Sequence, residues 1–393
     1  MAQLRAVLAT PEVPRLLGFA LLGRLPTAMS ALAVLLLVRG QGGTYTLAGL
    51  LAALLTAGTA VGQPLLARIV DRRGQPVVLV AAALVSSVAF AVLAVSGAHH
   101  PLVSAAAATL AGLGTPPLEP CLRALWPGVV GDGPRLQAAF SLDVGAQEVV
   151  YVAGPLLTTA AVTLVGDPGG VLACAVFGIA GTLAFVALRA PRAWRPTVHE
   201  GAHGSPLRHA LLVRIFVATF GCGVPVGALA VVATAYADDR GSSAITGWVL
   251  AANAAGALAS GLYSATRSRP LTSSVTVAGL ALSLGYLPLA LPLPVVAWAL
   301  AATLSGLALP VVLTAVFSTV QRVCPPNLLT EANAWVVTAF GLGAAGAALG
   351  AGVVSDHLHG GAAVAVIVLS GAVLTGLLAP VARTREPAET TLR

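Results

Sequence analysis

The stretch Ala67-Arg-Ile-Val-Asp-Arg-Arg-Gly-Gln-Pro76 places four charges within six positions of a chain in which only 9% of residues are charged. Apolar runs lie on both sides of it, LAGLLAALLTAGTAVGQPLL before and VVLVAAALVSSVAFAVLAV after. Each run has the length that crosses the hydrocarbon of a bilayer, which takes about 20 residues as a helix. The charged stretch is therefore expected to be a tight loop between two membrane helices.

Composition indicates a membrane protein throughout. Hydrophobic residues make up 57% of the 393 residues, too many for a surface that faces water. The net charge is +7, but the arginines are scattered between apolar segments and form no basic stripe, so the expected partner is a lipid bilayer and not nucleic acid. The four cysteines have neither metal-site nor disulfide spacing, and we expect no metal and no cofactor.

Twelve apolar stretches are candidate membrane helices, which predicts an all-α integral membrane protein. They are residues 15–38, 45–66, 76–96, 102–129, 137–164, 170–189, 210–236, 244–265, 271–292, 295–320, 330–354 and 361–381. The first lacks a small-residue cleavage site and is expected to be a retained helix. A long hydrophilic connection follows the sixth stretch. The predicted organisation is a six-helix bundle at 1–190, a linker at 191–209, a second six-helix bundle at 210–382 and a tail at 383–393.

The distribution of arginine predicts the orientation, because cytoplasmic loops carry the excess of positive charge. With a cytoplasmic N-terminus, the outside loops hold only Arg39 and Arg240. The inside loops then hold Arg68, Arg72, Arg73, Arg135, Arg189, Arg192, Arg195, Arg208, Arg267, Arg269, Arg322, Arg383, Arg385 and Arg393. Both termini and the linker are therefore expected in the cytoplasm.

The two halves contain an internal repeat. ATLAGLGTP at 108–116 matches ATLSGLALP at 302–310, an offset of 194 residues, and SALAV at 30–34 matches GALAV at 227–231. At the offset of 194, Ala67 also falls on Gly261. Each match places one helix of the first half on the corresponding helix of the second, as parallel repeats require.

This layout resembles the major facilitator superfamily, whose loop between helices two and three reads G-x-x-x-D-R-x-G-R-R. Asp71, Arg72 and Gly74 match that motif, whereas Ala67 replaces its first glycine and Gln75-Pro76 its final basic pair. The resemblance implies a cytoplasmic gate in which Asp71 lies against the N-terminal end of helix eleven, an anion at a positive helix dipole. The alternative is that these charges only anchor a loop and set the topology.

Five charged residues are expected near the middle of the membrane or just inside it, where each has an energetic cost and needs a reason. Arg24, Glu119 and Glu148 fall near the midplane by helix rise, and Arg123 and Asp143 are expected to form an ion pair below them. Arg24 can neutralise only one of the two glutamates. A buried carboxylate without a cation is more stable with a bound proton, so we expect Glu148 to carry the proton and Glu119 to pair with Arg24. The reverse assignment and a static network that locks the helices together remain open.

Other features give weaker indications. Gly154-Pro155 matches part of the G-P-x-x-G-G motif that exporters of this superfamily often carry in helix five, but Thr158 and Thr159 replace its last two glycines. Side chains that could line a substrate cavity are Tyr151, Asn253, Phe317, Trp335 and Phe340, and for each of them packing is an alternative role.

The resemblance implies a secondary transporter of the cell membrane that alternates between inward-open and outward-open states. We expect a monomeric, proton-coupled antiporter that exports amphipathic or cationic small organic compounds. The alternatives are an importer of a small nutrient and a transporter-like sensor that no longer transports. The chain has no HExxH, GxSxG or phosphate-binding lysine loop, so neither an enzyme nor ATP-driven transport is expected.

Overall fold

The computed structural model is a bundle of helices, with no β-strand among the residues that it describes. Those residues are 2–195, 205–238, 240, 244–266, 274–357, 369 and 371–373. The first half, called the N-half, holds α1 (Ala2–Leu8), α2 (Val13–Gly40), α3 (Tyr45–Arg73), α4 (Gln75–Ser96), α5 (Pro101–Leu113), α6 (Leu118–Val130), α7 (Pro134–Val165), α8 (Gly169–Ala187) and α9 (Arg189–Ala193). The second half, called the C-half, holds η1 (Pro206–Arg208), α10 (Ala210–Asp238), α11 (Ala244–Ala265), α12 (Val275–Gly285), η2 (Leu287–Ala290), α13 (Val295–Gly306), α14 (Ala308–Val323), η3 (Pro326–Leu328) and α15 (Leu329–His357). The predicted all-α class is confirmed.

Seven stretches are long and apolar enough to span a membrane, judged by length and composition over the described residues. They are Val13–Gly40, Leu47–Arg73, Gln75–Ser96, Pro134–Val165, Gly169–Ala187, Ala210–Leu229 and Val295–Val323. Helices also occupy the other expected stretches up to 330–354. The expected last span at 361–381 lies outside the described residues apart from 369 and 371–373, so the count of twelve stays a prediction.

Three expected spans are broken rather than continuous in the part of the chain that the structure describes, which corrects the prediction of single helices there. In the span at 271–292, α12 ends at Gly285 and the short 3-10 helix η2 follows. The span at 102–129 divides into α5 and α6 because Gly114 and the pair Pro116-Pro117 interrupt the backbone hydrogen bonds of a helix. The span at 295–320 divides into α13 and α14 at Leu307. The breaks at Gly114 and at Leu307 both begin within the repeated nine-residue motif, so the repeat extends from sequence to backbone shape.

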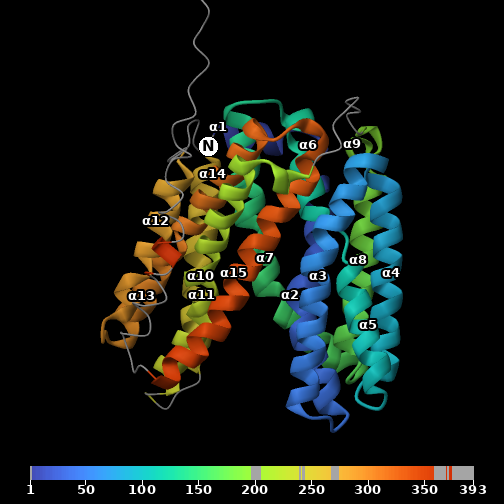
Figure 1. Ribbon diagram of the computed structural model, residues 1–393, viewed down its shortest axis with the longest axis vertical. Helices are drawn as coiled ribbons and strands as arrows, with labels where there is room; N and C mark the ends of the chain where they lie inside the picture. The colour runs from blue at the N-terminus through green and yellow to red at the C-terminus, as the bar shows by residue number, and fades with distance from the viewer. Residues whose placement is uncertain are drawn as a thin grey trace, which may run out of the picture.

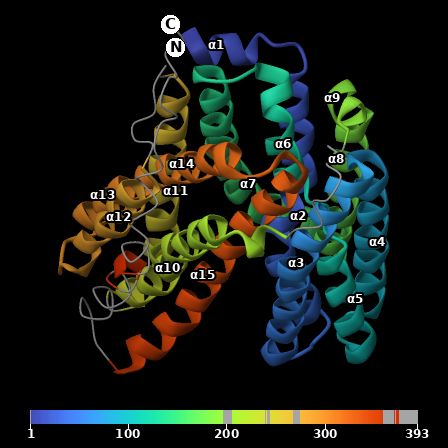
Figure 2. The ribbon, with the colours of Figure 1, turned by 45° about the horizontal axis from the view of Figure 1, so that its top comes forward.

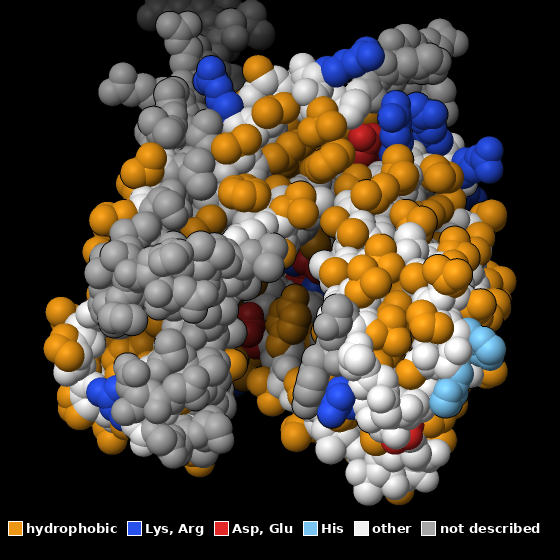
Figure 3. Space-filling model, turned by 60° about the horizontal axis from the view of Figure 1, so that its bottom comes forward, with side chains coloured by type: hydrophobic (Ala, Val, Ile, Leu, Met, Phe, Trp, Pro, Cys, Tyr) orange, Lys and Arg blue, Asp and Glu red, His pale blue; other side chains and the backbone are white. Residues whose placement is uncertain are grey.

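The two halves stand side by side and meet toward the face that carries the N-terminus, called the N-face (Figure 1). Their contacts are made by α7 against α11 and α14, and by α15 against α3 and α6. The view turned by 45° agrees, with α15 crossing in front of α7 and running away from α3 toward the opposite face (Figure 2). On that opposite face the surface between the halves is hollowed, with acidic and basic side chains visible inside (Figure 3).

The charged stretch at residues 67–76 contains a tight turn, as expected. α3 ends at Arg73 and α4 begins at Gln75, so Gly74 alone joins them, and its φ of +90° is a conformation that favours glycine. Gln75 is fully buried and donates a hydrogen bond to the carbonyl oxygen of Cys121 in α6, at 3.1 Å. This residue, where the family motif has a basic one, ties the turn to the neighbouring helix.

Candidate functional site

Four charged side chains from three helices form one closed network, and three of them are buried. Arg24 of α2 reaches Asp143 of α7 at 2.7 Å and Glu119 of α6 at 3.2 Å. Arg123, one turn after Glu119 in α6, reaches Asp143 at 2.9 Å and also pairs with Glu119. Each cation therefore contacts both acids, and the two charges of each sign balance. Buried charges require such partners, because an unpaired ion loses its hydration without compensation.

The members of this network differ in exposure. The side chain of Asp143 is 0% exposed, that of Arg123 is 1% and that of Arg24 is 4%, whereas the Glu119 carboxylate is 22% exposed. The only member with a substantial surface is thus an acid, and it stands in the first turn of α6, directly after the break.

Arg123 also connects the network to the C-half. Its guanidinium lies 3.6 Å from the ring centroid of Phe317 in α14, a cation–π contact. Phe317 is 2% exposed and stacks on Phe140 of α7, with ring centroids 6.3 Å apart. In this structure the Phe317 side chain is buried against Arg123 and is not one of the residues that line the cavity described below, so its role in substrate binding stays a prediction.

Glu148 stands apart from the four charges. It lies in α7 and is partly buried, and among the described residues it has neither an ion-pair nor a hydrogen-bond partner. It interacts electrostatically with the side chains of Tyr151 and Tyr286, which come from the two different halves. The structure thus brings Arg24, Glu119, Arg123 and Asp143 together and leaves the second midplane glutamate without a cation.

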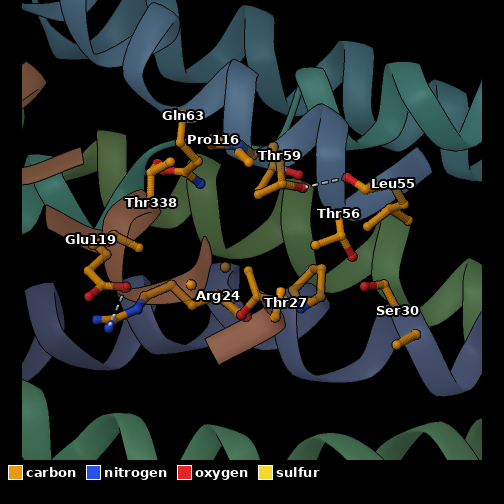
Figure 4. Close-up of a pocket in the computed structure, with 18 of the residues that line it drawn as sticks. Arg24, Thr27, Ser30, Leu55, Thr56, Thr59, Gln63, Pro116, Glu119 and Thr338 are labelled. Atoms are coloured by element: carbon orange, nitrogen blue, oxygen red, sulfur yellow. Dashed lines mark hydrogen bonds and ion pairs between the residues drawn. The ribbon is translucent and has the colours of Figure 1, made fainter. Parts of the chain in front are cut away.

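A cavity of about 250 Å³ lies between the N-half and α15, and Glu119 is part of its lining. Its wall comes mainly from α2, α3 and α15, with Gln147 and Tyr151 contributed by α7. Figure 4 shows Thr56 and Ser30 facing each other across it, with the Arg24–Glu119 pair at one end. Tyr151, one of the residues expected from the sequence, belongs to this wall and is 54% exposed.

The other expected cavity residues lie elsewhere. Asn253 of α11 is 8% exposed, and its amide nitrogen is within 3.3 Å of Tyr286 Oη and 3.0 Å of Ser305 Oγ. It joins helices of the C-half, which was the alternative role. The ring of Trp335 packs against that of Phe216, with centroids 6.4 Å apart, and Phe340 packs against the apolar core. Neither residue is among those that line the cavity.

Several cavity residues were missed by the sequence analysis. They are Thr27, Ser30, Thr56, Thr59, Gln63, Thr115, Gln147 and Thr338. A signal for three of them was present, because Thr56, Thr59 and Gln63 recur at helical spacing within an otherwise apolar run. Threonine is common in apolar helices for packing reasons, which is why the spacing did not stand out.

Asp71 joins α3 to α15 at the N-face. Its two carboxylate oxygens accept hydrogen bonds from the backbone N–H groups of Thr330 and Glu331, at 3.2 and 2.8 Å. These N–H groups belong to the first turn of α15, where backbone N–H groups have no acceptor within the helix. The helix dipole also favours an anion at this end. Nearby, Arg68 lies 3.7 Å from Glu331, which joins α3 to α15 a second time. The exposed Arg72 and the turn at Gly74 flank the contact.

Gly154 has a packing role in this structure, whereas Pro155 is exposed. A Cβ on Gly154 would lie 2.7 Å from that of Ala28, so glycine is what lets α7 approach α2. α7 continues without interruption through Pro155, and Thr158 donates to the carbonyl oxygen of Gly154 at 2.9 Å.

Comparison with known proteins agrees with this architecture. The family model of the Major Facilitator Superfamily matches residues 16–348. No curated protein matches the chain in sequence. The fold is similar to that of the human organic anion transporter MFSD10 (TM-score 0.72, 18% identity, 95% of this chain and 99% of that one). It is also similar to a bacterial homologue of the iron transporter ferroportin in the outward-facing state (TM-score 0.71, 15% identity, 94% and 97%) and to the transporter FucP in the outward conformation (0.69, 12%, 96% and 100%).

Proposed function

Because this chain belongs to the Major Facilitator Superfamily, we propose that it is a proton-coupled secondary transporter of the cell membrane that exports small amphipathic or cationic organic compounds. The cavity between the halves opens on the face opposite the N-terminus, and the Asp71 contact holds the N-face together. With the N-terminus in the cytoplasm, as the arginine distribution predicts, this is an outward-open state. Rocking of the halves would release the Asp71 contact and open the cytoplasmic side.

Proton coupling rests on Glu148. This carboxylate is partly buried in α7 and has no cationic partner among the described residues. A carboxylate is more stable with a proton when it is shielded from water and more stable ionised when water reaches it. Glu148 interacts with tyrosines of both halves, so movement of the halves would change its surroundings. Those conditions suit an acid that takes up a proton on one side and releases it on the other.

The lining of the cavity supports the class of substrate. Leu55, Phe90 and Val337 supply apolar surface, and Glu119 supplies the one substantially exposed charge of the network. Sites for small organic molecules combine a mainly apolar wall with a few polar groups that fix the orientation. An amphipathic cation satisfies both parts of this wall.

The test compares three proteins in cells that lack their own efflux pumps: the wild type, Glu148→Gln, and Asp132→Asn as a control at an exposed position of the α6–α7 turn. Growth is measured over a panel of amphipathic toxic compounds at equal protein level. We expect the wild type and Asp132→Asn to protect and Glu148→Gln to lose protection, because glutamine cannot exchange a proton. Protection that survives in Glu148→Gln would exclude this residue as the carrier and shift the role to Glu119. Greater sensitivity of wild-type cells would indicate uptake.

A further inference from the structure

Four threonines of the cavity wall use their hydroxyl hydrogens within the protein. Thr27, Thr56, Thr59 and Thr115 each donate to a backbone carbonyl oxygen three or four residues earlier in the chain, at 2.7–3.0 Å. Figure 4 shows one of these bonds, from Thr59 to Leu55. A hydroxyl has one hydrogen and two acceptor lone pairs, so each of these side chains offers a ligand lone pairs only.

The cationic donors of the network are hidden from the cavity. The atoms Nε and Nη2 of Arg24 and Nη1 of Arg123 have almost no accessible surface, although Arg24 borders the cavity together with Glu119. Hydroxyls of Ser30, Tyr151 and Thr338 and two glutamine amides remain able to donate. Of the two charged side chains that line the cavity, Glu119 is 22% exposed and Arg24 is 4% exposed, so a ligand meets mainly negative charge. The threonine oxygens add further hydrogen-bond acceptors.

We propose, on the basis of the transport function given above, that this cavity selects organic cations that carry at least one N–H group, and that it discriminates against quaternary ammonium ions as well as anions. An N–H group donates to the threonine and carboxylate oxygens, whereas a quaternary ammonium leaves them without partners. Proteins bind quaternary ammonium ions with cages of aromatic rings. Of the described residues that line this cavity, only Phe90 and Tyr151 are aromatic.

The size of the cavity sets the choice of probe. An apolar cavity of about 150 Å³ holds benzene, so a cavity of about 250 Å³ accommodates a single ring with a short side chain. The probes are 2-phenylethylamine, its N,N,N-trimethyl derivative, phenylacetate and 2-phenylethanol. Titration calorimetry with the purified full-length protein at neutral pH, where the amine is protonated, gives the four affinities. We expect the amine to bind roughly 10- to 100-fold more tightly than the trimethyl derivative, because unpaired buried acceptors are costly.

Variants assign the selectivity to the threonine oxygens. Thr56→Val with Thr59→Val removes two acceptors at nearly constant shape and should reduce the preference for the amine to within about threefold. Thr163→Val is the control, because Thr163 makes the same bond within α7 but lies outside the cavity wall. Equal or tighter binding of the trimethyl ion, tighter binding of phenylacetate, or binding of none of the four probes would overturn the proposal.

Binding is measured without a gradient, so this test is independent of proton coupling. If the amine is preferred but Glu148→Gln still protects cells, the selectivity stands and the assignment of the proton carrier fails. If Glu148→Gln behaves as expected but the trimethyl ion binds equally well, the transport function stands and the inferred selectivity fails.

Discussion

At the scale of single residues, Asp143 holds the charge network together. It is fully buried and accepts from both guanidinium groups, at 2.7 and 2.9 Å. Without it, two buried cations would share the single carboxylate of Glu119. Removal of one partner from a buried ion pair is strongly destabilising because it leaves an uncompensated charge.

Asp143→Asn is therefore expected to destabilise the fold by about 3–5 kcal/mol. The measurement is the apparent melting temperature of the purified protein in detergent, compared with Asp132→Asn at the exposed α6–α7 turn. Melting temperatures that do not differ between the two variants would mean that the network adds little to stability and that its role lies elsewhere.

The residues of the site could be predicted from the sequence to different degrees. Charged side chains in apolar helices are conspicuous, and helix rise alone put Arg123 within reach of Asp143. The position of Asn253 could not be derived, because a polar side chain in a membrane helix serves a neighbouring helix or a ligand equally well. Whether Thr56 and Thr59 line the cavity depends on which face of α3 turns toward α15. That rotation is set by helix packing, which the sequence does not reveal.

At the scale of elements, α7 and α11 cross at two glycines. The Cβ that alanine would add at Gly261 lies 2.6 Å from the Cα of Gly145, closer than such atoms approach in proteins. At the repeat offset of 194, Ala67 of α3 and Ala339 of α15 take the corresponding positions, and these helices also join the two halves. The match of Ala67 with Gly261 thus reflects small residues at two related helix crossings.

Gly261→Ala is expected to force these helices apart, with a loss of roughly 1–3 kcal/mol in stability and reduced transport. Gly49→Ala is the matched control, because a Cβ there meets nothing within 4 Å. Protection in the growth assay and the melting temperature are both measured. A fully active Gly261→Ala protein would show that this crossing tolerates separation and does not guide the movement.

The helices themselves were largely predictable, and their interruptions were not. Apolar length indicates where a chain can cross a membrane, but it does not reveal a break such as that at Leu307, which has no proline beside it and stands three residues before Pro310. Comparison of the two repeats indicates the break at Leu307, because the first-half motif at 108–116 is also broken, next to Pro116-Pro117.

At the scale of the whole molecule, the Asp71 contact is expected to set the balance between the two states. Asp71→Asn keeps the shape but removes the charge that binds the first turn of α15. Spin labels at the exposed positions 135 and 322, on the N-face ends of α7 and α14, report the separation of the halves. We expect the variant to populate longer distances than the wild type. Unchanged distances, with Asp132→Asn as the reference, would mean that other contacts close this face.

The balance of charges in the network has an electrical consequence. Moving one elementary charge through the membrane potential involves about 2.3 kcal/mol per 100 mV. Arg24, Glu119, Arg123 and Asp143 sum to zero, so their displacement during rocking does almost no net work against the voltage. If Glu148 carries the proton as proposed, the occupancy of Glu148 and of the cavity contributes the charge that crosses, as far as the described part of this network is concerned. Exchange of one proton for one monovalent cation would be electroneutral, and such a pump would run on the pH difference alone, at the same rate in polarised and depolarised membranes.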